Sequence, residues 1–266
     1  MSHRPTAAEA VALYDAFARD YDHRFDTEPM RRIYERLAWE RVAALLPAAP
    51  GRVVDVGCGT GRNAERLRAL GHAVVGIEPS PEMRAVLADK PALAEGFTLR
   101  PETMEDAPLP EAGADAVLAM GSLQYAADPR MAVARFVRWV RPGAPVCVLV
   151  DSSVALTFEL LRLGRGDEAL VRLEEGCGVF VHAGRRSGVH LFDAGGITAL
   201  LREAGLARVG ACGILISASA QGREGCAAAI RADEEGVLAL ERRLQAVPAL
   251  TDAGKHILAW GYRDPA

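Results

Sequence analysis

The chain has 266 residues, of which 50% are hydrophobic and 25% charged, a composition typical of a folded globular protein and unlike that of a disordered or fibrous one. Its formal net charge is −4, with positive and negative residues interspersed, so the sequence offers no basic stripe for nucleic acid. We expect a single domain covering residues 1–266 and no nucleic-acid partner.

The cysteines and the apolar runs of the sequence indicate in which cellular compartment the protein is expected. Five cysteines are scattered without any C-x-x-C pair, which is typical of buried thiols in a reducing compartment and not of disulfides or zinc, so we expect no metal site. The first ten residues hold no apolar run of signal-peptide length, and no later stretch reaches the roughly 18 apolar residues of a membrane span. We therefore expect a cytoplasmic protein with no membrane partner.

Two helices are predicted in residues 1–50. Thr6 and Glu9 have the spacing of a capping box, and apolar residues then recur at helical intervals as far as Tyr21. After a polar break, Pro29 can begin a second helix, whose apolar stripe ends near Pro47.

Residues 51–150 alternate short apolar runs with helical segments. The runs include RVVDVG, AVVGIE, ADAVLAM and APVCVLVD. Continuous apolar strands separated by helices indicate a mainly parallel sheet that is covered on both faces. We therefore predict an α/β, doubly wound, Rossmann-like fold, and KHILAWGYR near the end of the chain adds a last strand.

After residue 150 the alternation of strands and helices is interrupted twice. Residues 151–192 are predicted to form an insertion with elements of its own, since about forty structureless residues are unusual in a compact domain. Residues 218–252 form a second insertion. We expect both insertions to cover a bound substrate.

Three glycines at alternate positions stand between the first strand of the core and its helix. Gly57, Gly59 and Gly61 permit a tight turn and let a ligand lie against bare backbone. Glu78 ends the next strand about twenty residues downstream, where a carboxylate can accept hydrogen bonds from both ribose hydroxyls of an adenosine group. Together these residues favour an adenosine-containing ligand.

A nicotinamide dehydrogenase uses the same topology, but its fingerprint is G-x-G-x-x-G. Here Arg62 occupies the place of the third glycine, and Gly61 comes one residue early. The spacing D-x-G-x-G-x-G, which begins at Asp55, instead resembles motif I of the class I S-adenosylmethionine-dependent methyltransferases.

The resemblance covers roughly residues 14–150. Residues 18–22 are similar to the short A-x-x-Y-D element of the family, and residues 76–80 to its second motif. Residues 105–110 resemble the segment that closes over adenine, and residues 141–144 resemble the turn into the fifth strand. The resemblance implies the class I methyltransferase fold, with an antiparallel last strand, and S-adenosyl-L-methionine as cofactor.

It also implies which residues hold that cofactor. Tyr21 would cover the methionine end, Glu78 would bind the ribose, and Met104 would pack on the adenine. Thr103 departs from the family pattern, because many relatives have an aspartate there. The complete set implied by the resemblance is Tyr21, Asp55, Gly57, Gly59, Glu78, Pro79, Thr103, Met104 and Met120.

We expect methyl transfer to a small-molecule acceptor by in-line displacement, for which a dedicated base is optional. Tyr125, His182 and His190 are the predicted catalytic residues. Further polar candidates are Glu159 and His256 for the acceptor, and Ser122 and Gln124 for either the cofactor or the acceptor. The alternative is a catalytically inactive partner or regulatory protein that binds S-adenosylmethionine. The identity of the acceptor and the element methylated stay open, as does the choice between monomer and homodimer.

Overall fold

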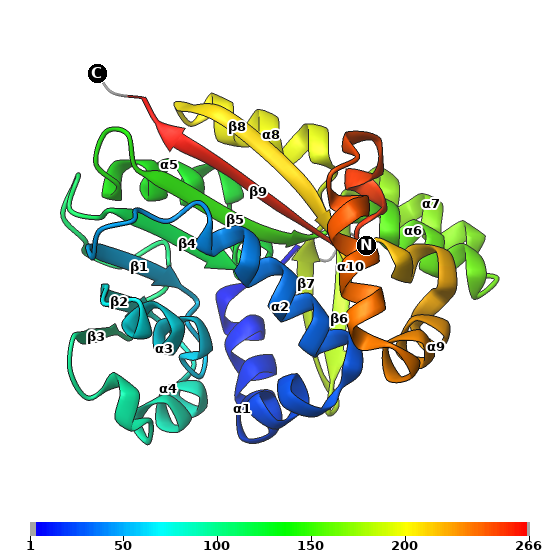
Figure 1. Cartoon of the computed structure of the whole chain (residues 1–266), viewed down its shortest axis with the longest axis horizontal. Helices are drawn as coiled ribbons and strands as arrows, with labels where there is room; N and C mark the ends of the chain where they lie inside the picture. Colours follow the sequence, from blue (N-terminus) through cyan, green and yellow to red (C-terminus); the bar gives the residue numbers. More distant parts are fainter. Residues whose placement is uncertain (1–3, 265–266) are drawn as a thin grey trace.

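The computed structural model describes residues 4–264 and contains one seven-stranded sheet (Figure 1). Its strands, in spatial order, are β3 (Phe97–Arg100), β2 (Ala73–Ile77), β1 (Arg52–Val56), β4 (Ala116–Met120), β5 (Pro145–Asp151), β9 (His256–Arg263) and β8 (Leu206–Ile214). Strands β1 to β5 are parallel, whereas β9 runs antiparallel to both β5 and β8. The predicted mainly parallel sheet with an antiparallel last strand is confirmed.

Helices cover both faces of this sheet, as the apolar strands predict. One face carries α5 (Pro129–Trp139) and α8 (Ala194–Glu203). The other carries α2 (Pro29–Ala43), α3 (Arg62–Ala69), α9 (Ser217–Ala232) and α10 (Glu234–Gln245). The remaining helices of the first hundred residues are α1 (Ala7–Thr27) and α4 (Pro81–Ala88).

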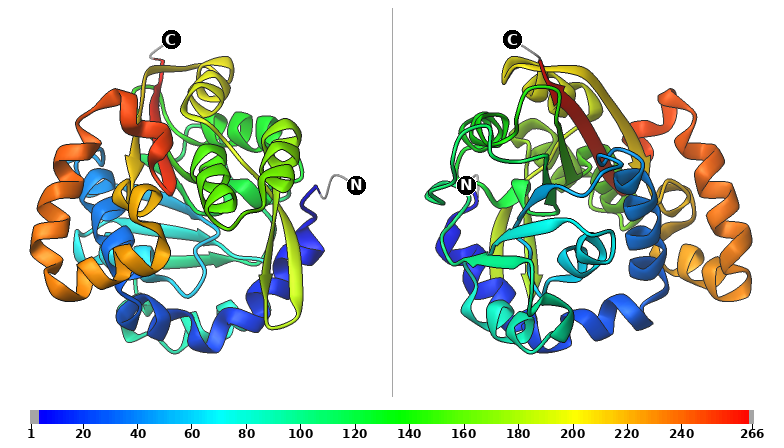
Figure 2. Two further views of the ribbon diagram at one scale, coloured as in Figure 1. Left: turned by 90° about the vertical axis from the view of Figure 1, so that its right-hand side faces the viewer. Right: turned by 60° about the vertical axis from the view of Figure 1, so that its left-hand side comes forward.

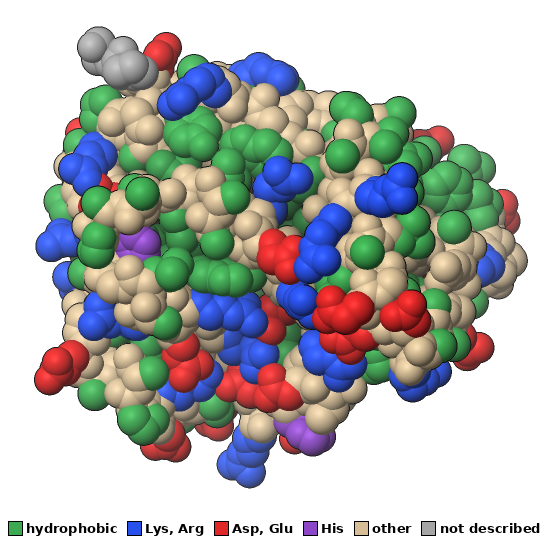
Figure 3. All heavy atoms as spheres, in the orientation of Figure 1, with side chains coloured by type: hydrophobic (Ala, Val, Ile, Leu, Met, Phe, Trp, Pro, Cys, Tyr) green, Lys and Arg blue, Asp and Glu red, His purple; other side chains and the backbone are tan. Residues whose placement is uncertain are grey.

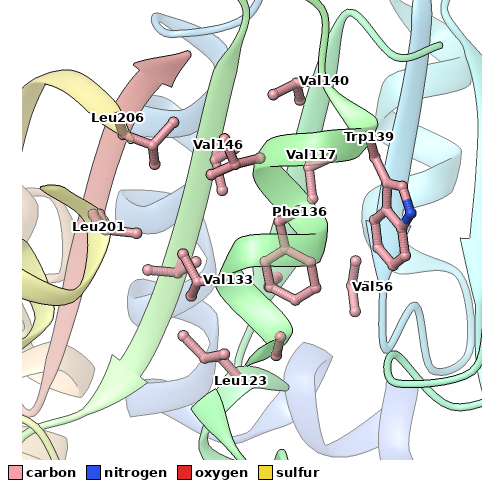
Figure 4. Packing of buried hydrophobic residues seen from close by; sticks show 14 of the residues in the cluster. Val56, Val117, Leu123, Val133, Phe136, Trp139, Val140, Val146, Leu201 and Leu206 are labelled. Carbon is pink, nitrogen blue, oxygen red and sulfur yellow. The ribbon is translucent and has the colours of Figure 1, made fainter. Parts of the chain in front are cut away.

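Alternate side chains of each central strand enter the two cores. Val117 of β4 faces the side of α5, whereas its neighbour Leu118 faces the side of α2. Figure 4 shows Phe136 of α5 packed beside Val117 and Val133. Since both faces are buried, these strands contain long unbroken apolar runs, which made them visible in the sequence.

The first N-terminal helix begins where the capping box predicts. Thr6 is its N-cap, and the Thr6 hydroxyl accepts a hydrogen bond from the backbone N–H of Glu9 at 3.3 Å. The helix then lies across the carboxyl ends of β1 and β2 and contacts α4 (Figure 1). Among residues 4–264, no helix is both long and apolar enough to span a lipid bilayer.

The insertion at residues 151–192 contains two helices and a hairpin. These are α6 (Ser153–Arg162), α7 (Gly166–Glu175), β6 (Cys177–His182) and β7 (Arg185–His190). Figure 2 shows the hairpin lying alongside α1, with which both of its strands are in contact.

The insertion at residues 218–252 packs against α2. Ion pairs join Arg36 to Glu235, at 2.7 Å, and Arg242 to Glu40, also at 2.7 Å. Figure 3 shows the basic and acidic side chains next to one another over α2 and α10. Residues 218–252 therefore extend the helical layer that contains α2, so that this layer also covers β8 and β9.

Candidate functional site

A pocket opens at the carboxyl ends of β1, β2 and β4, beneath α1. Eight of the nine predicted cofactor-binding residues line it, namely Tyr21, Gly57, Gly59, Glu78, Pro79, Thr103, Met104 and Met120. The ninth, Asp55, is buried below the glycine loop with 1% of its surface exposed. The structure thus brings the predicted set together where ligands of open parallel sheets bind.

The glycine loop contains two glycines that are required for different reasons. Gly57 has a φ of +66°, and a β-carbon there would lie 2.5 Å from Cβ of Ser122. Gly59 has a φ of +56°, but a β-carbon there would meet no atom within 4 Å. Gly57 therefore permits close packing against the segment after β4, whereas Gly59 keeps the backbone bare beside the pocket.

We expect Gly57→Ala to destabilise the fold more than Gly59→Ala does. Both variants place a side chain in the left-handed region, which costs about 1–2 kcal/mol. Gly57→Ala must in addition displace Ser122, whose hydroxyl donates to the Val56 carbonyl at 2.6 Å. Urea unfolding of the two variants measures the difference, and equal losses would show that the contact with Ser122 relaxes without cost.

Glu78 joins the glycine loop to the start of α4. Its carboxylate accepts hydrogen bonds from the backbone N–H groups of Gly59 and Ser80, both at 2.8 Å. Burial raises the pKa of Glu78, and the two N–H donors partly offset this shift. Each carboxylate oxygen keeps a further lone pair, so Glu78 can also accept hydrogen bonds from two vicinal hydroxyls.

Asp55 is a buried carboxyl group for which the described residues 4–264 supply no ion-pair partner. Its Oδ2 atom has no hydrogen-bond partner among the described residues. Burial, together with the charge of Glu78, raises the pKa of Asp55 to about 7. Such a carboxyl fits a ligand that brings a positive charge, as the ammonium group of a methionine moiety does.

Thr103 and Met104, which follow β3 in the chain, also line the pocket. The Thr103 hydroxyl donates to Asp106 at 2.9 Å, and the Met104 carbonyl accepts from Arg135 at 3.1 Å. The Met104 side chain is therefore the part of this residue that can lie against a flat ring.

Tyrosines of α1 form the roof of the pocket. Tyr14 and Tyr21 line it together with Tyr125, which follows β4. The rings of Tyr14 and Tyr125 meet edge to face, with centroids 5.3 Å apart. Burial is the main cause that raises the pKa of Tyr21 to about 12, and it also raises the pKa values of Tyr14 and Tyr125. All three hydroxyls are therefore neutral at physiological pH.

His182 and His190 do not line this pocket, because the hairpin that carries them packs on α1 from the side. The His182 ring stacks on Phe17 at 3.5 Å, and its Nδ1 lies 3.4 Å from Arg24. The Nε2 atom of His190 lies 3.1 Å from the Ala126 carbonyl oxygen. Their predicted contact with an acceptor thus has no support in this geometry, whereas Tyr125 does line the pocket.

A polar cluster that sequence reasoning only partly identified lies at the ends of β5 and β9. Nδ1 of His256 is 2.8 Å from Oδ1 of Asp151, and the Gln124 amide nitrogen is 3.4 Å from Oδ2. A β-carbon on Gly121, which lines the pocket, would lie 3.9 Å from the Tyr34 hydroxyl. The available signal was the position of Asp151 at the carboxyl end of a strand, on the same edge as the pocket.

The sheet order and this pocket define a Rossmann-like α/β protein with a ligand site at the carboxyl edge. Residues 54–148 match the methyltransferase domain family. The segment from β1 to β5 therefore carries a methyltransferase domain of the class I S-adenosylmethionine-dependent type.

Two curated relatives match part of the chain. Human methyltransferase-like protein 27 is 35% identical over 147 residues, which cover 54% of this chain and 58% of that protein. A ubiquinone biosynthesis O-methyltransferase of Xanthomonas axonopodis pv. citri is 32% identical over 128 residues, which cover 47% of this chain and 53% of that protein. The chain therefore spans little more than half the length of these relatives.

Among solved structures, the cyclase SpnF superposes with a TM-score of 0.65 and 18% sequence identity, over 100% of both chains. At this identity the similarity concerns the fold alone. Because SpnF is named as a cyclase, this likeness does not define the reaction.

Proposed function

We propose that the protein transfers the methyl group of S-adenosylmethionine to a small molecule. The observation that carries the proposal is one pocket with buried carboxyl groups at its strand ends and an aromatic roof above them. When bound, S-adenosylmethionine supplies a methyl group activated by a positively charged sulfur. The chain then has to hold an acceptor in line, and positioning of this kind lowers a barrier by up to about 7–11 kcal/mol.

The residues present fit this cofactor. Glu78 would accept hydrogen bonds from the ribose hydroxyls, and Asp55 would face the ammonium group of the methionine moiety. The bare backbone at Gly59 leaves room for the ligand, and Met104 would lie against the adenine. Tyr21 would close the methionine end from above.

A small acceptor is favoured because α1 roofs the pocket. Its residues Ala7 to Tyr21 contribute part of the lining, and the β6–β7 hairpin packs against it (Figure 2). Residues 151–192 would thus cover the acceptor indirectly, by holding α1, whereas residues 218–252 would support α2. A polymer chain would have to displace α1 to reach the sheet edge.

A catalytically inactive protein that binds S-adenosylmethionine is the second candidate. The fold alone does not decide between the two candidates, because the same fold also serves proteins such as a cyclase. We further propose a cytoplasmic protein that acts as a monomer or homodimer. Five buried cysteines support the compartment, and a pocket built within one chain suits either assembly.

Calorimetry tests the cofactor assignment. We expect S-adenosylhomocysteine and S-adenosylmethionine to bind, and NAD to bind more weakly than either, because Arg62 replaces the last glycine of the dinucleotide fingerprint. Tighter binding of NAD than of S-adenosylhomocysteine would overturn the proposal.

A further inference from the structure

We propose that the methyl acceptor is a small amine, which binds as a cation in an aromatic chamber beside Asp151. The inference rests on the proposed function, because three of the residues that form the chamber, Tyr14, Tyr21 and Tyr125, line the same pocket. We call this aromatic chamber the tyrosine chamber and define it by Tyr14, Tyr21, Tyr34, Tyr125 and Asp151.

Aromatic rings of α1 and α2 form one wall of the tyrosine chamber. The Tyr14 ring lies 5.3 Å from Tyr125 and 6.4 Å from Tyr21. Phe25 continues the wall, with its ring 4.9 Å from Tyr21 and 6.1 Å from Tyr34. The face of an aromatic ring attracts a cation within about 6 Å, as the Phe25 ring already does with Arg31 at 5.2 Å and with Arg62 at 5.4 Å.

Polar residues at the ends of β5 and β9 complete the tyrosine chamber. The His256 ring lies 4.5 Å from the Tyr34 ring, and its Nδ1 contacts Asp151 at 2.8 Å. Asp151 in turn contacts Gln124 at 3.4 Å, and Gln124 directly precedes Tyr125. These contacts therefore connect Asp151 to Tyr34 on one side and, through Gln124, to Tyr125 of the pocket on the other.

The charges of the site favour a cation over an anion. Among the described residues that line the pocket, the charged side chains are Glu78 and Glu105, with no lysine or arginine. Two cations lie near the tyrosine chamber, and each is paired with a glutamate: Lys255 is 3.8 Å from Glu159, and Arg31 is 2.7 Å from Glu28. A carboxylate or phosphate acceptor would therefore enter without a counterion from the lining, at a considerable desolvation cost.

Asp151 supplies a fixed negative charge. Burial acts to raise the pKa of Asp151, but the hydrogen bond from His256, with smaller contributions from Lys255 and Gln124, holds this pKa below its usual range. Burial is the main cause that raises the pKa values of Tyr14, Tyr34 and Tyr125. The nearby charge of Asp151 raises them further. The tyrosine chamber therefore combines an ionised carboxylate with neutral phenols.

Gln124 offers an acceptor atom that the protein leaves unused. The residue is 5% exposed, and its amide nitrogen faces Asp151. Its Oε1 atom has no partner among the residues that the structure describes. A buried carbonyl oxygen without a donor favours a ligand that brings N–H groups.

His256 can receive the proton that an amine must lose before it attacks. An ionised Asp151 only accepts hydrogen bonds, so Nδ1 of His256 carries the proton of their contact and Nε2 of the neutral ring keeps a lone pair. The ammonium group gives one proton to Nε2, and its nitrogen recovers a lone pair. That pair forms the bond to the methyl carbon while the sulfur retains the electrons of the broken bond, and His256 afterwards releases its proton to solvent.

The test uses the whole protein saturated with S-adenosylhomocysteine. Calorimetry near pH 8, where simple amines are protonated and an ordinary histidine is neutral, measures binding of matched probes. The probes are phenethylamine, phenethyl alcohol and phenylacetate, together with butylamine, butanol and butyrate. The variants are Asp151→Asn, which can still accept from His256, and Gln124→Met, which removes the free carbonyl. Asp193→Asn is the control, because this exposed carboxylate caps α8 and asparagine caps equally well.

We expect an amine of at least one series to bind more tightly than its alcohol and carboxylate. Asp151→Asn should weaken that binding by roughly tenfold or more, and Gln124→Met should weaken it by a smaller factor. Affinity for S-adenosylhomocysteine, which reports that each variant is folded, should stay within about twofold of the wild type, which is under 0.5 kcal/mol.

Binding of the alcohol or carboxylate in preference to the amine, or an unchanged amine affinity in Asp151→Asn, would overturn the inference and leave the cofactor assignment intact. Failure of the wild type to bind S-adenosylhomocysteine would overturn the proposed function itself, and the inference with it. If Asp151→Asn does not fold, an unchanged amine affinity in Gln124→Met overturns the inference.

Discussion

Glu78→Ala is expected to cause the largest loss of cofactor affinity and also to destabilise the fold. Removal of the carboxylate deletes the proposed ribose contacts, which are worth on the order of 1.5–3 kcal/mol, or about 10- to 100-fold in Kd. It also leaves the N–H groups of Gly59 and Ser80 unpaired, at about 1–3 kcal/mol for each that stays buried. Calorimetry with S-adenosylhomocysteine and urea unfolding measure the two effects.

The control for this prediction is Glu95→Ala, which removes an exposed carboxylate and should change stability by no more than about 0.5 kcal/mol. Glu78→Gln separates the two roles of Glu78, because its amide oxygen can still accept from one backbone N–H. We expect Glu78→Gln to recover part of the stability and little of the affinity. Normal cofactor binding by Glu78→Ala would show that Glu78 is a structural residue only.

Asp55→Asn is expected to change the pH dependence of both stability and binding. Burial raises the folded-state pKa of Asp55 to about 7, well above its unfolded value of 3.8. The protonated carboxyl therefore stabilises the fold at low pH, and this contribution is lost as the pH rises through about 7. Between roughly pH 5.5 and 8.5 the loss amounts to about 2 kcal/mol. We expect the unliganded wild type to show this loss in urea unfolding and Asp55→Asn to lack it.

Cofactor binding should show the opposite trend with pH. An ammonium group favours the ionised form of Asp55, so wild-type affinity for S-adenosylhomocysteine should rise as the pH increases through about 7. Asp55→Asn should bind more weakly at pH 8 and lose most of this dependence. Asp193→Asn, which removes an exposed carboxylate, should behave as the wild type. Parallel pH profiles for the wild type and Asp55→Asn would show that Asp55 does not face the ammonium group.

The sheet and its parallel order could be predicted from the sequence because each central strand is buried on both faces. Val117 and Leu118 enter opposite cores, so neither position tolerates a polar residue and the apolar run is unbroken. The cofactor half of the site could be predicted for a related reason. Gly57 and Glu78 directly follow strands, and the carboxyl ends of parallel strands meet at one edge.

The acceptor half could not be predicted, because it depends on contacts between segments far apart in the chain. Asp151 and His256 meet through the antiparallel register of β5 and β9, which no local pattern specifies. Tyr14 and Tyr34 belong to apolar stripes whose packing partner is set by the docking of whole helices. His182 and His190 lie in the insertion where a cover was expected, but their hairpin packs on α1.

The most direct test of methyl transfer to a small molecule uses the wild-type protein, S-adenosylmethionine with an isotopically labelled methyl group, and an extract of the host cells. After incubation, the extract is separated into small-molecule, protein and nucleic-acid fractions, and labelled products are identified by mass spectrometry. We predict label in a small-molecule product, at a level that falls in Asp151→Asn and is unchanged in Asp193→Asn. Label confined to protein or nucleic acid, or absent from every fraction, would contradict the proposed function.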